Sequence, residues 1–224
     1  VLKHCNKDVD TYMSQAFFAK QNRRAINVSS ITHAFVDLDI YNTDKAHFSR
    51  DQMVMAIRIF CEDEGIPAPT MIISSGRGYY LKWMWDNPLP RKLAGVFTAA
   101  LQRLIYLFQG FGSDSKCRDI SRILRVVGTT NSKSGTRAEI LHIEEEDGRP
   151  ISYRFEDFCT EIFEHSFQDI REYREAAQER KKERKQYSPA QIRSFRAWKA
   201  RKAGLHSNSW LDWHWRVVED ILTL

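Results

Sequence analysis

The sequence predicts an α+β fold, in which a mixed or antiparallel sheet with flanking helices is followed by a C-terminal helical region. Three observations favour this class. Short apolar runs bounded by glycine and proline indicate strands, and longer segments with apolar residues at helical spacing lie between them. After Glu156 the pattern is helical to the end of the chain. We therefore expect a mixed α/β domain over residues 1–164 and a helical domain over residues 165–224.

The first half of the chain predicts one capped helix among three strands. Residues 30–40 (SITHAFVDLDI) are typical of a buried strand whose exit is acidic. Ser49 and Gln52 match a capping box, and the helix that they begin is expected to end at Gly65. Residues 70–75 and 79–85 then predict two strands joined by a tight turn at residues 76–78, which together make a hairpin.

The second half begins with a long amphipathic helix, whose apolar positions run from Leu93 to Phe108 and which glycines 110 and 112 end. Residues 137–143 predict a further strand, and a turn at residues 147–148 is expected to lead into residues 151–155. A helix start at residues 188–189 and a final amphipathic helix from Trp210 complete the helical region.

Composition excludes several classes of protein. Of the 224 residues, 42% are hydrophobic and 12% aromatic, which excludes a disordered or collagen-like chain. No apolar run is long enough to span a membrane, and no signal-peptide pattern opens the chain. The first residue is not methionine, so we expect a trimmed or processed chain. Cysteines 5, 61, 117 and 159 form no C-x-x-C pair, which favours reduced thiols in a cytoplasmic protein over zinc ligands or disulfides.

The net charge of +5 lies entirely in the C-terminal region. Residues 1–164 hold 21 basic and 21 acidic residues, whereas residues 165–224 hold 13 basic and 8 acidic ones. Between residues 171 and 202 the basic side chains alternate with aromatic ones, an arrangement typical of single-strand nucleic-acid binding. The alternative is a solvated helical bundle that packs through its aromatics.

Two aspartates end the first strand. Asp37 and Asp39 are two residues apart, so their side chains are expected to share one strand face. Neighbouring carboxylates repel each other unless a cation lies between them, and Mg²⁺ or Mn²⁺ prefers such oxygen ligands. The alternative is a loop start, where aspartate is common.

Two further segments could bind phosphate. In the hairpin, the backbone and hydroxyl of Ser75, the glycines 76 and 78 and the Arg77 guanidinium could meet phosphate oxygens, although an ordinary β-turn also explains the glycines. Farther along, Asp114 precedes three arginines at residues 118, 122 and 125, which would share one face if the segment were helical. These arginines either pair with nearby carboxylates or bind phosphates.

Taken together, FVDLD, SSGRGYYLKW and DSKCRDISRILRVVGTTNSK resemble the archaeo-eukaryotic primase superfamily, and within it the RepB-type replication primases of plasmids and phages. The resemblance covers about residues 8–145 and implies an RRM-like catalytic core. It also implies a D-x-D strand end, a Ser-Gly-x-Gly hairpin, a third aspartate, and a G-T-x-N-x-K segment. Their counterparts here are Asp37 and Asp39; Ser75, Gly76 and Gly78; Asp114; and Gly128, Thr129, Asn131 and Lys133.

One position departs from the family pattern. Family hairpins carry a histidine shortly after the second glycine, which contacts the phosphates of the incoming nucleotide, and this chain has Tyr79 and Tyr80 there. We expect Tyr80 to replace the histidine, with Arg77 or Lys82 giving the cationic contact.

The resemblance implies a DNA primase, a nucleotidyltransferase that makes primers on a single-stranded DNA template for replication of a plasmid, phage or mobile element. Its partners would be nucleoside triphosphates, the template and a replicative helicase, with no membrane. Three aspartates would hold two Mg²⁺ or Mn²⁺ ions and carry catalysis, namely Asp37, Asp39 and Asp114. Expected nucleotide-binding residues are Ser75, Gly76, Arg77, Gly78, Tyr80, Lys82, Arg122, Arg125, Asn131 and Lys133. Expected template-binding residues are Arg118, Lys181, Lys182, Arg193 and Trp198, and Asp119 is expected to orient an arginine.

Three alternatives stay open. A non-catalytic origin-binding or single-strand-binding replication protein with a degenerate primase fold would lack the histidine, as this chain does, but would not need all three aspartates. A metal-dependent glycosyltransferase also uses a D-x-D strand end, but the arginine-rich segment and the basic tail argue against it. The third alternative is a nuclease.

Overall fold

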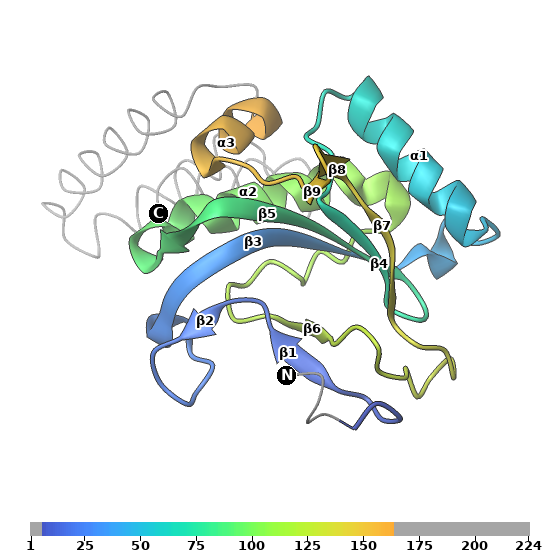
Figure 1. The fold of residues 1–224 in the computed structure, drawn as a ribbon, viewed down its shortest axis with the longest axis horizontal. Helices are drawn as coiled ribbons and strands as arrows, with labels where there is room; N and C mark the ends of the chain where they lie inside the picture. Colours follow the sequence, from blue (N-terminus) through green and yellow to red (C-terminus); the bar gives the residue numbers. More distant parts are fainter. Residues whose placement is uncertain (1–5, 164–224) are drawn as a thin grey trace, which may run out of the picture. The chain divides into compact units, whose positions relative to one another are not determined.

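A five-stranded sheet forms the centre of the protein in a computed structural model, which describes residues 6–163 (Figure 1). The strand order is β2-β3-β5-β4-β7, and every pair of neighbours is antiparallel. The strands are β2 (Phe17–Phe18), β3 (Val28–Leu38), β4 (Met71–Ser74), β5 (Tyr79–Pro90) and β7 (Glu139–Ile143). The chain divides into two units, residues 1–164 and 165–224, and the second lies outside the described residues.

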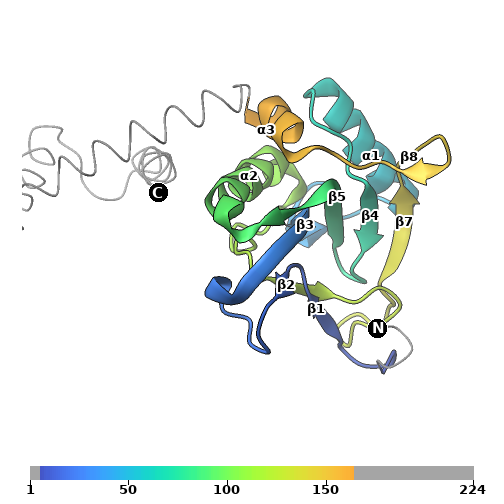
Figure 2. The same cartoon turned by 60° about the vertical axis from the view of Figure 1, so that its left-hand side comes forward.

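Three helices cover one face of this sheet, as both ribbon views show (Figures 1 and 2). They are α1 (Arg50–Asp63), α2 (Ala94–Leu107) and α3 (Phe155–Phe163). Between the sheet and the helices, Trp83 is fully buried and its ring lies 5.9 Å from that of Phe108 and 6.1 Å from that of Phe158. The opposite face of β3 and β5 carries both apolar side chains, such as Phe35, and the polar ones Asp37 and Lys82.

The opposite face carries a smaller two-stranded sheet, in which β1 (Tyr12–Ser14) pairs antiparallel with β6 (Ile123–Arg125) (Figures 1 and 2). The sequence did not reveal β1, β2 or β6. Strands of two or three residues are too short to show alternation, so tertiary pairing alone defines them.

The predicted fold class is confirmed, and most predicted elements are present. The Ser49–Gln52 capping box begins α1, the hairpin joins β4 to β5, and α2 continues as a 3₁₀ turn over Phe108–Phe111 before Gly112. The predicted turn at residues 147–148 is present and joins two short strands that were not expected, β8 (Glu145–Glu146) and β9 (Arg149–Pro150). Helix α3 begins at Phe155, at the end of the segment that follows the turn.

Short 3₁₀ turns complete the fold at Ala25–Asn27, Ile40–Asn42 and Arg91–Leu93. Within residues 6–163, no helix has the length and apolar character needed to cross a lipid bilayer. Cysteines 61, 117 and 159 are buried and form no disulfide.

Candidate active site at the end of strand β3

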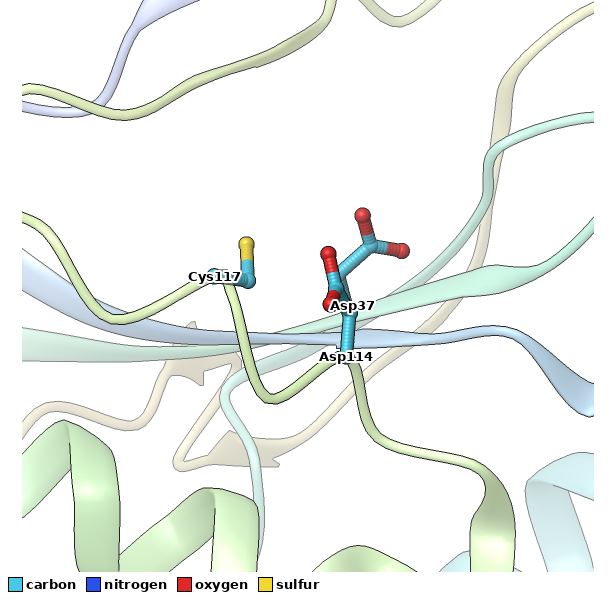
Figure 3. A group of neighbouring side chains, drawn as sticks. All are labelled: Asp37, Asp114 and Cys117. Carbon is cyan, nitrogen blue, oxygen red and sulfur yellow. The ribbon is translucent and has the colours of Figure 1, made fainter.

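Asp37 lies at the end of β3 on the side away from the helices. Along this strand Val36 and Leu38 are fully buried and alternate with Asp37, which is directly opposite Tyr80 of β5. The carboxylate therefore projects from the non-helical face of the sheet (Figure 3).

Backbone hydrogen bonds bring the distant Asp114 to the same point. The Asp114 N–H donates to the Asp37 carbonyl and the Asp39 N–H donates to the Gly112 carbonyl, both at 2.8 Å. Gly112 has φ of +74°, and a Cβ there would lie only 2.5 Å from the Asp39 carbonyl oxygen. Glycine is thus required for residues 112–114 to approach the end of β3 so closely.

The result is a cluster of two carboxylates and one thiol. Ligand atoms of Asp37, Asp114 and Cys117 all lie within 4.8 Å of one another, and their side chains project from neighbouring segments toward the same side (Figure 3). Carboxylate oxygens suit hard divalent cations. Cys117 was not expected here, and its only sequence signal is its place three residues after Asp114.

Asp39 lies just after the end of strand β3, although the sequence predicted it inside the strand. Strand β3 ends at Leu38, and Asp39, with φ of −95° and ψ of 77°, precedes the 3₁₀ turn Ile40–Asn42. Asp39 therefore lies just beyond the strand, and its sharing of one face with Asp37 stays a prediction. Asp39 is not a member of the Asp37, Asp114 and Cys117 cluster, but it is close enough for its charge to raise the pKa of Asp37.

The electrostatics of the cluster favour a cation. Burial, followed by repulsion from Asp39 and Asp114, raises the pKa of Asp37 to about 7, while Arg122 opposes this rise. Burial also raises the pKa of the Cys117 thiol to about 12, so the sulfur stays protonated at neutral pH. A divalent cation would relieve the repulsion between the carboxylates, and the oxygen-rich donor set fits Mg²⁺ or Mn²⁺.

The hairpin packs directly on this strand end. The Ser75 N–H donates to the Gly78 carbonyl at 2.9 Å, and the Gly78 N–H donates to the Ser75 hydroxyl at 3.0 Å. A Cβ on Gly78 would lie 2.2 Å from the Leu38 carbonyl oxygen, so only glycine allows this contact. The hairpin is thus held against the backbone that carries Asp37 and Asp39.

The G-T-x-N-x-K segment closes on the hairpin from the other side. The Asn131 side-chain amide donates to the Ser75 carbonyl at 3.1 Å, and the Thr136 hydroxyl donates to the Gly76 carbonyl at 2.6 Å. Asn131 is buried, whereas Lys133 in the same loop is exposed. The structure therefore brings together all three segments on which the family resemblance depends.

Lys82 is a part-buried cation on the same side of the sheet as Asp37. It follows Tyr80 by two residues in β5, and its ammonium group donates to the Gln15 side-chain oxygen at 2.7 Å. The same oxygen accepts from the His33 ring at 3.0 Å, since the Gln15 amide nitrogen donates to the Met13 carbonyl. Burial lowers the pKa of Lys82 to about 8, which keeps it charged at neutral pH. Among the described residues no carboxylate forms an ion pair with Lys82, so its charge is available to an anion.

Arg125 has a different environment. It is buried, and its guanidinium pairs with Asp10 at 2.5 Å and donates to the Thr130 carbonyl at 2.9 Å and the Tyr12 hydroxyl at 3.0 Å. Asp10 also accepts from the Ser132 backbone and hydroxyl, and these bonds hold the pKa of Asp10 at about 2. Asp10 thereby fixes β6 and the loop that follows it, a role that no sequence signal indicated.

The expectation that Arg118, Arg122 and Arg125 share one face depended on a helical segment, and this condition is not met. The segment forms turns and strand β6 rather than a helix, because β6 pairs with β1. Arg122 pairs with Asp119 at 2.9 Å and donates to the Lys116 carbonyl, whereas Arg118 is exposed. Asp119 orients Arg122 in this structure.

The predicted nucleotide-binding residues Arg77 and Tyr80 have different surroundings. The Arg77 guanidinium lies over the Tyr41 ring, 4.3 Å from its centre. Tyr80 is buried, and burial together with the Asp37 charge raises the pKa of its hydroxyl, while the nearby Arg125 opposes this rise. The remaining predicted template-binding residues lie outside the described residues, namely Lys181, Lys182, Arg193 and Trp198.

Part of this chain is similar in sequence to a curated protein. A replication protein of Clostridium perfringens is 37% identical over 134 residues, which are 60% of this chain and 32% of that protein. The chain thus spans about a third of the length of this relative. No family model matches the sequence.

Solved structures show the fold. The archaeo-eukaryotic primase domain of the primase-polymerase of cyanophage S-2L matches with a TM-score of 0.51 and 19% identity, over 68% of this chain and 70% of that one. The primase RepB′ matches with a TM-score of 0.38 and 18% identity, over 69% of this chain and 45% of that one. Its catalytic domain in complex with initiator DNA matches with a TM-score of 0.36 and 13% identity, over 59% and 60%. The expected resemblance to the archaeo-eukaryotic primase superfamily is confirmed, and this chain has the fold of its catalytic domain.

Proposed function

We propose that this chain is the catalytic part of a DNA primase, a nucleotidyltransferase that extends primers on single-stranded DNA during replication of a plasmid, phage or mobile element. One observation carries the proposal. Asp37 and Asp114, which are far apart in sequence, place their carboxylates in one cluster beside the Ser-Gly-x-Gly hairpin. The primase-polymerase fold and the similarity to a replication protein support the same conclusion.

Asp37 and Asp114 would hold the divalent cation, and Asp39 would complete the set through a small change of its backbone or a bridging water. When bound, Mg²⁺ or Mn²⁺ supplies Lewis-acid chemistry, since it lowers the pKa of a hydroxyl and neutralises charge on phosphate oxygens. The Cys117 thiol, neutral and buried, would limit water access beside the carboxylates rather than ligate a hard ion.

The chain's own residues orient the reactants. The primer 3′-oxygen attacks the α-phosphorus of the nucleoside triphosphate, a new P–O bond forms, and the bond to pyrophosphate breaks. Lys82, charged and without a carboxylate partner among the described residues, would bind the triphosphate from the sheet side. Arg77 and Lys133 reach solvent from the hairpin and the facing loop, where they would contact the same phosphates.

Several expected residues would act indirectly. Asn131 and Gly78 hold the hairpin in place, and Arg125 holds the loop of Asn131 through the Thr130 carbonyl. Tyr80, buried against Asp37, would set the position of that carboxylate instead of binding phosphate as a histidine would. Buried thiols such as Cys61 suit the reducing cytoplasm in which we place the protein.

The test is a primer-synthesis assay on a single-stranded template with labelled ribo- and deoxyribonucleoside triphosphates and Mn²⁺. The wild-type chain should make labelled products, and Asp37→Asn and Asp114→Asn should each lower the rate at least a hundredfold while binding the template as before. Asp63→Asn, which changes an exposed aspartate at the end of α1, is the matched control. Template binding without synthesis would favour the non-catalytic replication protein, and template degradation would favour the nuclease.

A further inference from the structure

A basic pocket lies at the β2 edge of the sheet, formed by the loop between β2 and β3 together with Arg91 at the end of β5. Its volume is about 510 Å³, and its charged lining residues are Lys20, Arg24 and Arg91. All three are exposed. We call this site the edge pocket.

Sheet register builds the edge pocket from segments far apart in sequence. Ser30 of β3 is opposite Phe17 of β2 on one side and Pro90 of β5 on the other, which brings Arg91 beside the β2–β3 loop. The loop is closed by hydrogen bonds from the Ala19 N–H to the Asn27 carbonyl and from the Asn27 N–H to the Arg24 carbonyl, both at 2.8 Å. Strand pairing and these hydrogen bonds therefore fix the backbone positions of the three cationic residues.

The charge of this region is of one sign. Residues 11–36 and residues 87–113 contain no aspartate or glutamate. Within residues 6–163, no carboxylate forms an ion pair with Lys20, Arg24 or Arg91, whereas other exposed arginines do pair, as Arg58 does with Glu144. Three unneutralised cations around one pocket attract a polyanion.

Two exposed apolar side chains belong to β2 and to the loop that forms the edge pocket. Phe17 on the edge strand β2 is 62% exposed, and Ile26 in the lining of the pocket is 65% exposed. An aromatic ring next to a basic groove offers a stacking surface for an unpaired base, and a duplex could not use it.

A hydrogen-bonded connection joins this loop to the candidate active site. Arg23 donates to the Ser121 carbonyl at 2.9 Å, and Ser121 in turn donates to Asp119 at 2.7 Å. Asp119 pairs with Arg122, whose charge acts on Asp37. The edge pocket is thus anchored to the segment that carries the third motif.

We propose that the edge pocket binds the phosphate backbone of single-stranded DNA, with one base stacked on Phe17, and so holds the template strand on its way to the carboxylate cluster. The identity of the strand as template rests on the proposed function. Arg118, the one predicted template-binding residue that the structure describes, does not line the edge pocket.

The experiment uses the full chain and measures fluorescence anisotropy of a labelled 20-nucleotide oligothymidine at several salt concentrations. The test variant is Lys20→Gln/Arg24→Gln/Arg91→Gln. The control is Arg50→Gln/Arg58→Gln/Arg154→Gln, which removes three exposed charges from the helical side. We expect the test variant to weaken binding about tenfold or more, and to flatten the slope of log affinity against log salt by about 2, at about 0.7 per lost phosphate contact. The control should change neither by more than about twofold.

A second variant separates stacking from charge. Phe17→Ala should weaken binding about fivefold or more with an unchanged salt slope, since a stacking contact releases no counterions. The alternative ligand of the edge pocket is the triphosphate of a nucleotide, and isothermal titration calorimetry with inorganic triphosphate tests it. We expect inorganic triphosphate to bind the test variant as tightly as it binds the wild type. Equal DNA affinities of the test and control variants, or loss of triphosphate binding alone, would overturn the proposal.

These outcomes are separable from failure of the proposed function, because DNA affinity is measured without catalysis. If the wild-type chain made no primers but the test variant still lost DNA affinity, the edge pocket would stand and the enzyme assignment would fall. If primers were made and the test variant kept its DNA affinity, the enzyme assignment would stand and the edge pocket would fall as a DNA-binding site.

Discussion

Asp37→Asn should stabilise the metal-free protein at alkaline pH. The pKa of Asp37 is raised from its ordinary 3.8 to about 7, so the folded state binds a proton that the unfolded state has lost between these two values. Stability of the wild type therefore decreases as pH rises from about 4 to about 7, and stays low above that. The asparagine variant carries no such charge and should not show this decrease.

The magnitude follows from the pKa difference. About three pKa units correspond to roughly 4 kcal/mol of unfolding free energy, which is an upper bound because solvent and backbone relaxation reduce it. For a protein of this size each kcal/mol shifts the melting temperature by about 2–4 °C. We thus expect Asp37→Asn to melt above the wild type by at most about 8–16 °C at pH 8, and by roughly two-fifths of that at pH 5, where the unfolded-state carboxyl is already ionised.

The assay is thermal unfolding of the full chain in a chelator at pH 5, 6, 7 and 8, followed by the same series with Mn²⁺. At a hundred times its dissociation constant, the metal should add about 2.7 kcal/mol to the unfolding free energy of the wild type at pH 8 and so raise its melting temperature. The variant should stay nearly unchanged. Asp63→Asn serves as the control in each series. A wild-type melting temperature that is flat across this pH range, or an Asp37→Asn variant that behaves like the control, would refute the burial and repulsion inferred for Asp37.

Three more predictions concern residues around the cluster. Gly78→Ala should lower the melting temperature and abolish primer synthesis, since its Cβ would lie 2.2 Å from the Leu38 carbonyl oxygen; circular dichroism and the primer assay check both effects. Asp10→Asn should raise the KM for the nucleoside triphosphate several-fold with a smaller change in kcat, because it loosens the loop that supports the hairpin, and a wild-type KM would contradict this role. Nucleotide affinity should decrease above about pH 8, where Lys82 loses its proton, and Lys82→Arg should remove this decrease; titrations between pH 7 and 9 that superimpose for both proteins would exclude Lys82 as the phosphate ligand.

The sequence by itself determined the elements whose signals are local. The capping box at Ser49, the apolar spacing of α2 and the glycine turn between β4 and β5 each occupy a few consecutive residues, so short-range stereochemistry defines them. The same holds for the family motifs, each of which is a contiguous segment of the sequence. Their order was enough to predict the fold class and to select Asp37, Asp39 and Asp114 as candidate metal ligands, of which Asp37 and Asp114 meet in one cluster.

Only the tertiary structure decided which of those residues meet and in what environment. Gly112 carries Asp114 to Asp37 through backbone hydrogen bonds, and the cluster that results contains Cys117 and not Asp39, which lies just beyond the strand end. Arg125 pairs with Asp10 because β6 pairs with β1. These strands have only three residues each, which is too short to produce a pattern of alternating hydrophobicity in the sequence. Local patterns specify residue type and element, whereas long-range contacts set burial and charge neighbours, and these determine whether a side chain is free to bind a ligand.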